Sequence, residues 1–198
     1  MRLLGLALAV VVAACAAPRA ADDGSRSPSV ETPMPTAPSA SADASPAPSA
    51  TDEGTAADPL LEYELVDVRS GETFNLGELA ADGPVLVETM AIWCTTCLSQ
   101  QREVVHAHEL RDFASVGIDV DPNERAPDLA AYADREGFDW HFVVADGELV
   151  RLLTERFGFE VTNPPSTPTF VVSAGSIRAL EFGRVRSADE LIDELDAG

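Results

Sequence analysis

The chain after residue 58 alternates between short apolar runs and amphipathic stretches. Leu61–Val68 alternates apolar and polar residues, which predicts a half-buried strand. Val85–Ile92 is an apolar run that contains one acid, Glu88, and this pattern predicts a central strand covered on both faces. The next stretch, Cys94–Asp112, contains no Gly or Pro and predicts a helix. Further strands are predicted at Ser115–Val120, Trp140–Val144, Thr169–Val172 and Ile177–Phe182, and further helices at Asp128–Glu136, at 149–157 and after the capping-box spacing of Ser187 and Glu190.

This alternation of strands and helices predicts an α/β domain of three layers, with a mainly parallel centre and an antiparallel end. The domain is expected to span residues 59–198. That length suits a single ordinary domain with its own core.

The first residues have the pattern of an export signal. Arg2 precedes twelve uncharged residues, Leu3–Ala14, which are too few to span a bilayer. The segment ends in Val12-Ala13-Ala14-Cys15 and resembles the lipobox of bacterial lipoproteins, in which the cysteine is lipidated. We therefore expect residues 1–14 to be a lipoprotein signal peptide and Cys15 to be the lipidation site; an ordinary secretory signal with an incidental cysteine is the alternative.

Residues 15–58 have a different composition. Of the 43 residues in Ala16–Asp58, 30 are Ala, Pro, Ser or Thr, and none is aromatic. Such a segment cannot bury enough apolar area to offset the entropy lost on ordering, so the sequence predicts a disordered tether.

The charge of the chain excludes some classes of partner. The 13 basic residues, all arginine, oppose 34 acidic ones, and the formal net charge is −21. Nucleic acids and anionic lipid headgroups require a basic surface, so neither is an expected electrostatic partner.

The chemistry of the chain is expected at Trp93-Cys94-Thr95-Thr96-Cys97, where a buried strand meets a helix. Two cysteines three residues apart at a helix start can close a disulfide, and the first faces the free N–H groups of that helix. Such motifs lower the pKa of the first thiol from about 8.5 to between roughly 3.5 and 7.5. The second thiol, one turn inward, would resolve a mixed disulfide.

Two other uses of this pair remain open from the residues alone. One is half of a zinc site completed by two of the histidines His106, His108 and His141, although there is no second Cys-x-x-Cys pair. The other is a structural disulfide, although so small a loop would constrain the unfolded chain little. For the histidines themselves, a solvated position is the default for His106 and His108, and a packing role is expected for His141.

The domain resembles the thioredoxin fold and, more narrowly, the TlpA-type thiol–disulfide oxidoreductases. The resemblance covers most of Tyr63–Leu195 and rests on Gly71–Leu76, Val85–Cys97, Gly117–Asp121 and Thr167–Val172. It implies a thioredoxin-like three-layer α/β/α fold around a central mixed sheet, without a cofactor or resident metal.

The resemblance also implies roles for individual residues. Cys94 would be the attacking thiolate and Cys97 the resolving thiol. Pro168 would be the cis-proline that lies against the sulfur pair, with the Thr167 backbone offering hydrogen bonds to a substrate peptide. Trp93 would pack beside the disulfide and contact partners.

Glu88 falls at the position of the buried acid that thioredoxins keep beneath the redox pair. A carboxyl in an apolar strand should have a raised pKa, which suits proton exchange with Cys97. The alternative is an acid that reaches solvent or pairs with an arginine. The chain departs from the family in having Thr96, not proline, before the second cysteine, and this leaves the reduction potential undetermined.

These observations lead to the expectation of a membrane-tethered thiol–disulfide oxidoreductase on the outer face of the cell membrane. Its partners would be client proteins with disulfides, and a membrane thiol carrier would donate electrons. The family analogy favours the reductant direction, with a role like that in cytochrome c maturation. The alternative is a copper-delivery or metal-binding module on the same fold; a peroxiredoxin-like peroxidase is disfavoured because its Pro-x-x-x-Thr-x-x-Cys arrangement is missing.

Overall fold

The computed structural model describes residues 58–197. Their centre is a five-stranded sheet in the order β5-β4-β3-β6-β7. The strands are β3 (Val85–Met90), β4 (Ala114–Asp119), β5 (His141–Val144), β6 (Thr169–Ser173) and β7 (Ser176–Ala179). β3, β4 and β5 run parallel, whereas β6 and β7 are antiparallel to their neighbours. The predicted mixed sheet, with a parallel centre and an antiparallel end, is therefore confirmed.

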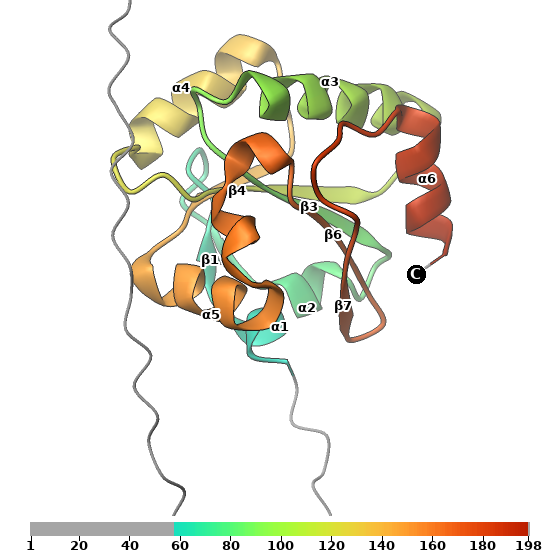
Figure 1. The fold of residues 1–198 in the computed structure, drawn as a ribbon, viewed down its shortest axis with the longest axis horizontal. Coiled ribbons are helices and arrows are strands. Elements are labelled where there is room, and N and C mark those ends of the chain that lie inside the picture. The colour runs from blue at the N-terminus through green and yellow to red at the C-terminus, as the bar shows by residue number, and fades with distance from the viewer. Residues whose placement is uncertain (1–57, 198) are drawn as a thin grey trace, which may run out of the picture. The chain divides into compact units, whose positions relative to one another are not determined.

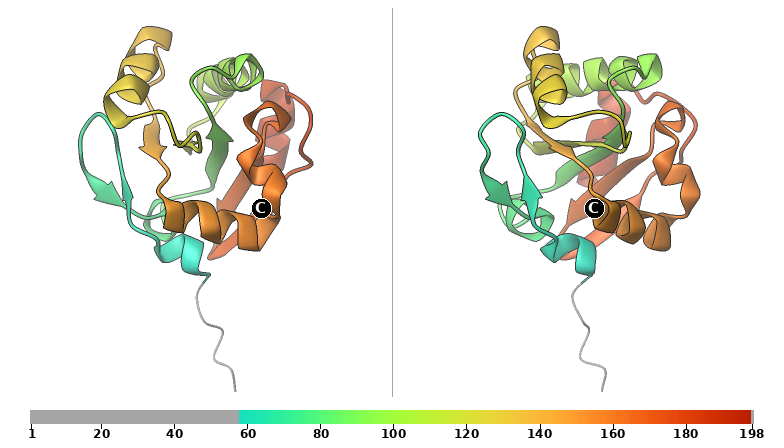
Figure 2. Two further views of the ribbon diagram at one scale, coloured as in Figure 1. Left: turned by 60° about the vertical axis from the view of Figure 1, so that its left-hand side comes forward. Right: turned by 90° about the vertical axis from the view of Figure 1, so that its left-hand side faces the viewer.

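Helices cover both faces of this sheet (Figure 1). On one face lie α3 (Thr95–Leu110), α4 (Ala126–Glu136) and α6 (Ala188–Asp196), and on the other lie α1 (Pro59–Glu62), α2 (Leu76–Leu79) and α5 (Gly147–Phe157). Figure 2 shows α3 and α4 on one side of the strands and α5 on the opposite side. Within residues 58–197, no helix combines the length and the apolar character needed to cross a lipid bilayer.

The two faces of the sheet follow from the alternation of side chains along each strand. In β3, Val85 and Val87 point into the core under α1 and α5, whereas Leu86 and Met90 point into the core under α3, α4 and α6. Glu88 has the same parity as Leu86 and Met90, so it lies on the α3 face. All six residues of β3 are buried, as a strand in the middle of a covered sheet requires.

Local signals in the sequence set the ends of several helices. α4 ends at Gly137, which takes the left-handed conformation with φ of 77°. α5 begins at Asp146, whose side chain accepts from the N–H groups of Glu148 and Leu149. The capping box of Ser187 and Glu190 is formed at the start of α6, as predicted.

The single strand predicted over Leu61–Val68 is wrong. Its first residues belong to α1, and only Leu65–Val66 form a strand, β1, which pairs with β2 (Thr73–Phe74). The cause is a helix start that the alternation obscured: Asp58 accepts a hydrogen bond from Leu60 N–H, and Pro59 occupies the first turn.

A second departure lies between α5 and β6. The chain there forms two short 3₁₀ helices, η1 (Phe159–Thr162) and η2 (Pro164–Ser166), which the hydrophobic pattern did not predict. Thr89 Oγ1 in β3 donates to the Val161 carbonyl at 2.7 Å and fixes this segment to the end of the sheet. The segment therefore lies beside the start of α3, where the cysteines are.

Candidate active site

Cys94 and Cys97 form a disulfide at the first turn of α3, with their Cα atoms 5.3 Å apart. β3 leads into the site through a turn in which Cys94 N–H donates to the Ala91 carbonyl at 3.0 Å. Cys94 is the N-cap of α3, and its sulfur accepts from Cys97 N–H at 3.1 Å. The backbone amides of the helix start thus face the sulfur on which the sequence-based mechanism places negative charge.

Both cysteines are buried: Cys94 is 2% exposed and Cys97 is 0% exposed. The cover includes η2, because the Pro164 carbonyl oxygen lies 3.2 Å from the Cys97 sulfur. In the disulfide this is a contact, and after reduction the Cys97 thiol can donate to the same carbonyl. Cys94 is thus nearly inaccessible in this structure, which the sequence did not suggest.

The expected cis-proline is wrong. Every peptide bond in residues 58–197 is trans, including the bond before Pro168. The chain turns instead at Thr167, which follows η2 in the left-handed region with φ of 47° and ψ of 58°. The Pro164 carbonyl contacts the Cys97 sulfur.

Both Thr167 backbone groups form hydrogen bonds within the chain. Its N–H donates to the Pro164 carbonyl at 2.8 Å, and its carbonyl accepts from Thr169 Oγ1 at 3.0 Å. The residue is fully buried. In this arrangement the Thr167 N–H is already engaged and its carbonyl accepts one hydrogen bond, so peptide binding by this residue stays a prediction.

Glu88 lies in the middle of β3 and is 5% exposed. Burial raises the pKa of this carboxyl well above its usual range. Its Oε1 has no hydrogen-bond partner among the described residues. Because the raised pKa favours the protonated form, this carboxyl is suited to donate a proton.

Two further polar side chains share the α3 face with Glu88. Tyr132 of α4 donates from its hydroxyl to Gln101 Oε1 of α3 at 2.5 Å. The pKa of Tyr132 is raised first by burial and then by the charge of Glu88. Gln101 Nε2 is buried without a partner in the part of the chain that the structure describes. The sequence reasoning missed both residues, because nothing in their spacing distinguishes them from ordinary helix positions.

Trp93 is the exposed aromatic next to the disulfide, with 57% of its surface open to solvent. Its indole N–H donates to Asp121 Oδ2 at 2.6 Å. This bond to Trp93, together with the Asn123 amide, lowers the pKa of Asp121. A second exposed aromatic, Phe159 in η1, is 86% exposed, and the hydrophobic pattern gave no sign of it.

The sequence reasoning also missed two acids near the loop that contains Trp93 and Cys94. Asp119, the last residue of β4, is fully buried, and Glu124 accepts a hydrogen bond from Ile92 N–H at 2.7 Å. Burial and the neighbouring Glu124 raise the pKa of Asp119 to about 8. The sequence signal was present in Asp119-Val120-Asp121, but the contact with Ile92 depends on the pairing of β3 with β4.

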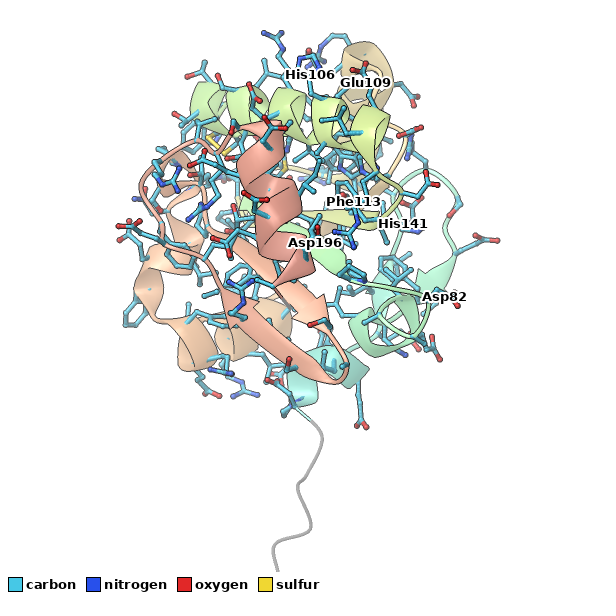
Figure 3. The ribbon with its side chains drawn as sticks, turned by 90° about the vertical axis from the view of Figure 1, so that its right-hand side faces the viewer. Asp82, His106, Glu109, Phe113, His141 and Asp196 are labelled. Carbon is cyan, nitrogen blue, oxygen red and sulfur yellow. A yellow bond between two sulfur atoms is a disulfide. The ribbon has the colours of Figure 1, made fainter. Side chains whose placement is uncertain are left out.

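The histidines do not gather at the cysteines. Figure 3 shows His106 on the outer side of α3 beside Glu109, and His141 away from that helix. His141 packs against Phe74 with the ring centroids 4.6 Å apart, as expected of a packing residue. His108 differs from its predicted solvated position, because it is half-buried and stacks on Phe113 at 4.0 Å. Among residues 58–197, no three His, Cys, Asp or Glu side chains form a group that could hold a metal ion.

Cys15 lies outside the described residues, as do the predicted signal peptide and nearly all of the predicted tether.

Comparison with known proteins identifies the fold. No family model matches the chain, and no curated protein matches it in sequence. Solved structures do match. A DsbF homologue from Corynebacterium diphtheriae is 22% identical with a TM-score of 0.54, covering 75% of this chain and 90% of that one. A secreted Mycobacterium tuberculosis disulfide oxidoreductase homologous to E. coli DsbE is 16% identical with a TM-score of 0.53, covering 72% and 100%.

A third match is a thiol:disulfide interchange protein of the thioredoxin family from Chlorobium tepidum, 22% identical with a TM-score of 0.52, covering 68% of this chain and 91% of that one. The described domain therefore has the thioredoxin fold, as predicted. Two of these neighbours are named as a thiol:disulfide interchange protein and a disulfide oxidoreductase, and the redox pair expected in this chain is present as the Cys94–Cys97 disulfide.

Proposed function

We propose that this thioredoxin-fold protein exchanges the Cys94–Cys97 disulfide or dithiol with disulfides of client proteins. The observation that supports this most strongly is the disulfide itself, placed at the N-terminus of α3 directly after the central strand. At that position backbone amides stabilise a Cys94 thiolate, and the second sulfur is held within bonding distance of the first.

The reductive cycle follows from the two sulfurs. The Cys94 thiolate attacks one sulfur of a client disulfide, the client disulfide breaks, and the departing client thiolate takes a proton. The Cys97 thiol then loses its proton and attacks Cys94 Sγ of the mixed disulfide. This step releases the second client thiol and closes the Cys94–Cys97 bond, so two electrons and two protons pass to the client.

Glu88 is assigned the proton exchange with Cys97 in this cycle. The carboxyl is buried on the α3 face of the sheet, and Cys97 at the start of α3 belongs to the core on that face. A raised pKa favours the protonated form and so suits proton exchange with a thiol, whereas an ordinary surface carboxyl is already ionised at neutral pH.

Trp93 and Phe159 are assigned to client contact. Both are exposed aromatic residues, and they belong to the two segments that meet at the sulfur pair, the Trp93–Cys97 motif and the η1–η2 segment. Aromatic side chains with large exposed apolar area are typical contact points for protein partners.

The same proposal places the protein outside the cell membrane. Signal residues 1–14 would be removed, Cys15 would carry the lipid anchor, and residues 15–58 would tether the domain. Extracytoplasmic compartments are oxidising, so a protein that works there as a reductant needs electrons from inside the cell, and a membrane thiol carrier would supply them. The family analogy supports this direction and a role like that in cytochrome c maturation.

Disulfide reduction by the full chain tests the proposed activity. In a Cys15→Ser background, Cys94 and Cys97 are the only thiols, and the protein should reduce insulin at the expense of a dithiol. Cys94→Ser should abolish this activity, whereas Cys97→Ser should accumulate a mixed disulfide visible on a non-reducing gel. Stoichiometric copper or zinc binding by an inactive Cys15→Ser chain would instead support the metal-binding module.

Two further measurements test the direction and the anchor. A reductant should show a potential nearer to about −270 mV than to about −120 mV when it is equilibrated with glutathione. The full chain should sediment with membranes, and Cys15→Ser should release it without changing insulin reduction.

A further inference from the structure

The turn that carries the first cysteine leaves one of its amides without a partner inside the turn. Cys94 N–H donates to the Ala91 carbonyl at 3.0 Å and closes this turn, of which Ile92 is the second residue. In a four-residue turn closed in this way, the N–H of the second residue takes no part in the closing bond. Ile92 is half-buried and packs against the core under α3, so its N–H needs a partner from elsewhere in the chain.

That partner is a carboxylate from the connection between β4 and α4. Glu124 Oε2 accepts from Ile92 N–H at 2.7 Å, which joins residues 32 positions apart in the sequence. A hydrogen bond from a backbone amide to a carboxylate is stronger than one to a neutral acceptor. Because the donor is a main-chain group, this contact fixes the path of the loop rather than the rotamer of one side chain.

The Glu124 side chain extends from a turn that has hydrogen bonds of its own. Glu124 N–H donates to the Asp121 carbonyl at 3.2 Å, and Asp121 Oδ1 accepts from the Asn123 backbone and side chain at 2.8 and 2.9 Å. Pro122 restricts the backbone within this turn. The carboxylate that contacts Ile92 therefore comes from an ordered segment, which suits it to hold the loop.

Two neighbouring contacts join the same two connections. Val120 N–H donates to the Met90 carbonyl at 3.0 Å and extends the pairing of β4 with β3. The Trp93 indole donates to Asp121 Oδ2 at 2.6 Å. Of these three contacts, only that of Glu124 holds a backbone group inside the turn.

We propose that Glu124 is a positioning residue for the Cys94 sulfur, because it holds Ile92 N–H and thereby keeps that sulfur against the amides at the start of α3. This inference rests on the proposed function and adds a residue that acts through Ile92. The Cys94 sulfur accepts from Cys97 N–H at 3.1 Å, and the strength of such a bond depends on its distance and angle. A loop released from Glu124 can turn the sulfur out of this alignment, so a thiolate on Cys94 loses part of its stabilisation.

Two substitutions of Glu124 separate its hydrogen bond from its charge. Glu124→Gln keeps an oxygen that can accept from Ile92 N–H, whereas Glu124→Leu has a similar volume but no acceptor. Both remove the same negative charge, so a difference between them reports the hydrogen bond alone. Glu124→Ala also lacks the acceptor and serves if Glu124→Leu does not fold. Asp134→Asn and Asp134→Leu are the matched controls, because they make the same pair of changes at an exposed position of α4.

The positioning role can be tested by the ultraviolet absorbance of the Cys94 thiolate as a function of pH, in the reduced full chain with Cys15→Ser. At one pH near the midpoint, the thiolate-to-thiol ratio should be about threefold lower in Glu124→Leu than in Glu124→Gln. The Ile92 amide should exchange its hydrogen with solvent faster in Glu124→Leu than in Glu124→Gln. The two Asp134 variants should give superimposable thiolate curves.

Thiolate curves of Glu124→Gln and Glu124→Leu that superimpose would overturn the positioning role. Equal exchange rates of the Ile92 amide in the two variants would overturn it as well, because the contact would then not hold the loop. The thiolate titration needs no client protein. A chain that shows the threefold difference but does not reduce insulin would therefore refute the proposed function and leave the positioning of the Cys94 sulfur standing.

Discussion

The two faces of the central sheet differ in the polarity of their buried side chains. The face under α1 and α5 is almost wholly apolar, with Val85, Val87, Phe170 and Val172 packed against helix leucines. The face under α3, α4 and α6 contains the disulfide and several buried polar side chains. These are Glu88, Gln100, Gln101, Asp119 and Arg186.

Because of this difference, one face mainly stabilises the fold and the other contains the groups proposed to take part in the chemistry. Apolar packing stabilises without directional demands, so the α5 face can hold the sheet together at any pH. Buried polar groups need partners, and several atoms on the α3 face lack one within the described residues, including Glu88 Oε1 and Gln101 Nε2. Such groups cost stability, and they are located where the proposed chemistry uses protons.

The largest loss of stability is expected when a side chain in the apolar core under α1 and α5 is truncated. Phe170 is 1% exposed and packs on Phe157 at 4.4 Å between ring centroids. Phe170→Ala should lower the free energy of unfolding by about 3 to 5 kcal/mol in urea denaturation. Insulin reduction per folded molecule should stay within a factor of about two of the parent. Phe159→Ala, at an exposed site, should change stability by less than about 0.5 kcal/mol.

The pH dependence of stability should come from the α3 face. Glu88 and Asp119 have folded-state pKa values raised above the ordinary carboxyl value by burial, Asp119 to about 8. Between pH 6.5 and 8 the folded state therefore holds protons that the unfolded chain has lost, so rising pH favours unfolding. Asp119 alone should lower the free energy of unfolding by about 1 to 2 kcal/mol across this window, and Glu88 should add to the fall.

Urea denaturation of the oxidised chain at several pH values measures this slope. Glu88→Gln and Asp119→Asn should each flatten the slope, whereas Asp134→Asn should not. A parent slope that is flat or positive between pH 6.5 and 8 would contradict the assignment of both buried acids.

Glu88→Gln should distinguish a role of Glu88 in proton transfer from a purely structural role. The substitution preserves volume and hydrogen-bonding capacity but removes the proton, so insulin reduction should slow by about 10- to 100-fold. The mutant should be no less stable than the parent at pH 8, because folding no longer requires proton uptake at this position. Equal rates for mutant and parent from pH 6 to 8 would show that Glu88 is a structural acid.

Much of this architecture could be predicted from local patterns. The apolar run of β3, the stop of α4 at Gly137 and the Ser187–Glu190 capping box are all encoded by neighbouring residues, and all three are confirmed. The error at Leu61–Val68 arose because a four-residue helix is too short to show a 3.6-residue period. The Asp58-Pro59 start signal then outweighed the alternation.

The contacts around the disulfide were harder to predict from the sequence. The contacts of Pro164 with Cys97 and of Glu124 with Ile92 join residues 67 and 32 positions apart. They depend on strand pairing and on the path of η1 and η2, which have no periodicity of their own. Pro168 was assigned by its motif, but the motif did not reveal that Thr167 would turn the chain with its own backbone groups already paired.

The smallest effect on stability is expected at the N-terminal cap of α6. Ser187 Oγ accepts from Glu190 N–H, and the Glu190 carboxylate accepts from Ser187 N–H at 2.9 Å. Ser187→Ala should destabilise the oxidised chain by about 1 kcal/mol, measured by thermal unfolding. Ser99→Ala, at an exposed position of α3, is the matched control and should leave the melting temperature nearly unchanged.

The Pro164 carbonyl over the Cys97 sulfur has a consequence for how the protein discriminates among reaction partners. Because Cys97 is fully buried beneath this carbonyl and Cys94 is only 2% exposed, the disulfide is shielded from collisions with small thiols, and its oxidation state should persist between encounters. A partner that binds beside the disulfide and shifts the surrounding chain gains access, so its binding energy contributes to selectivity.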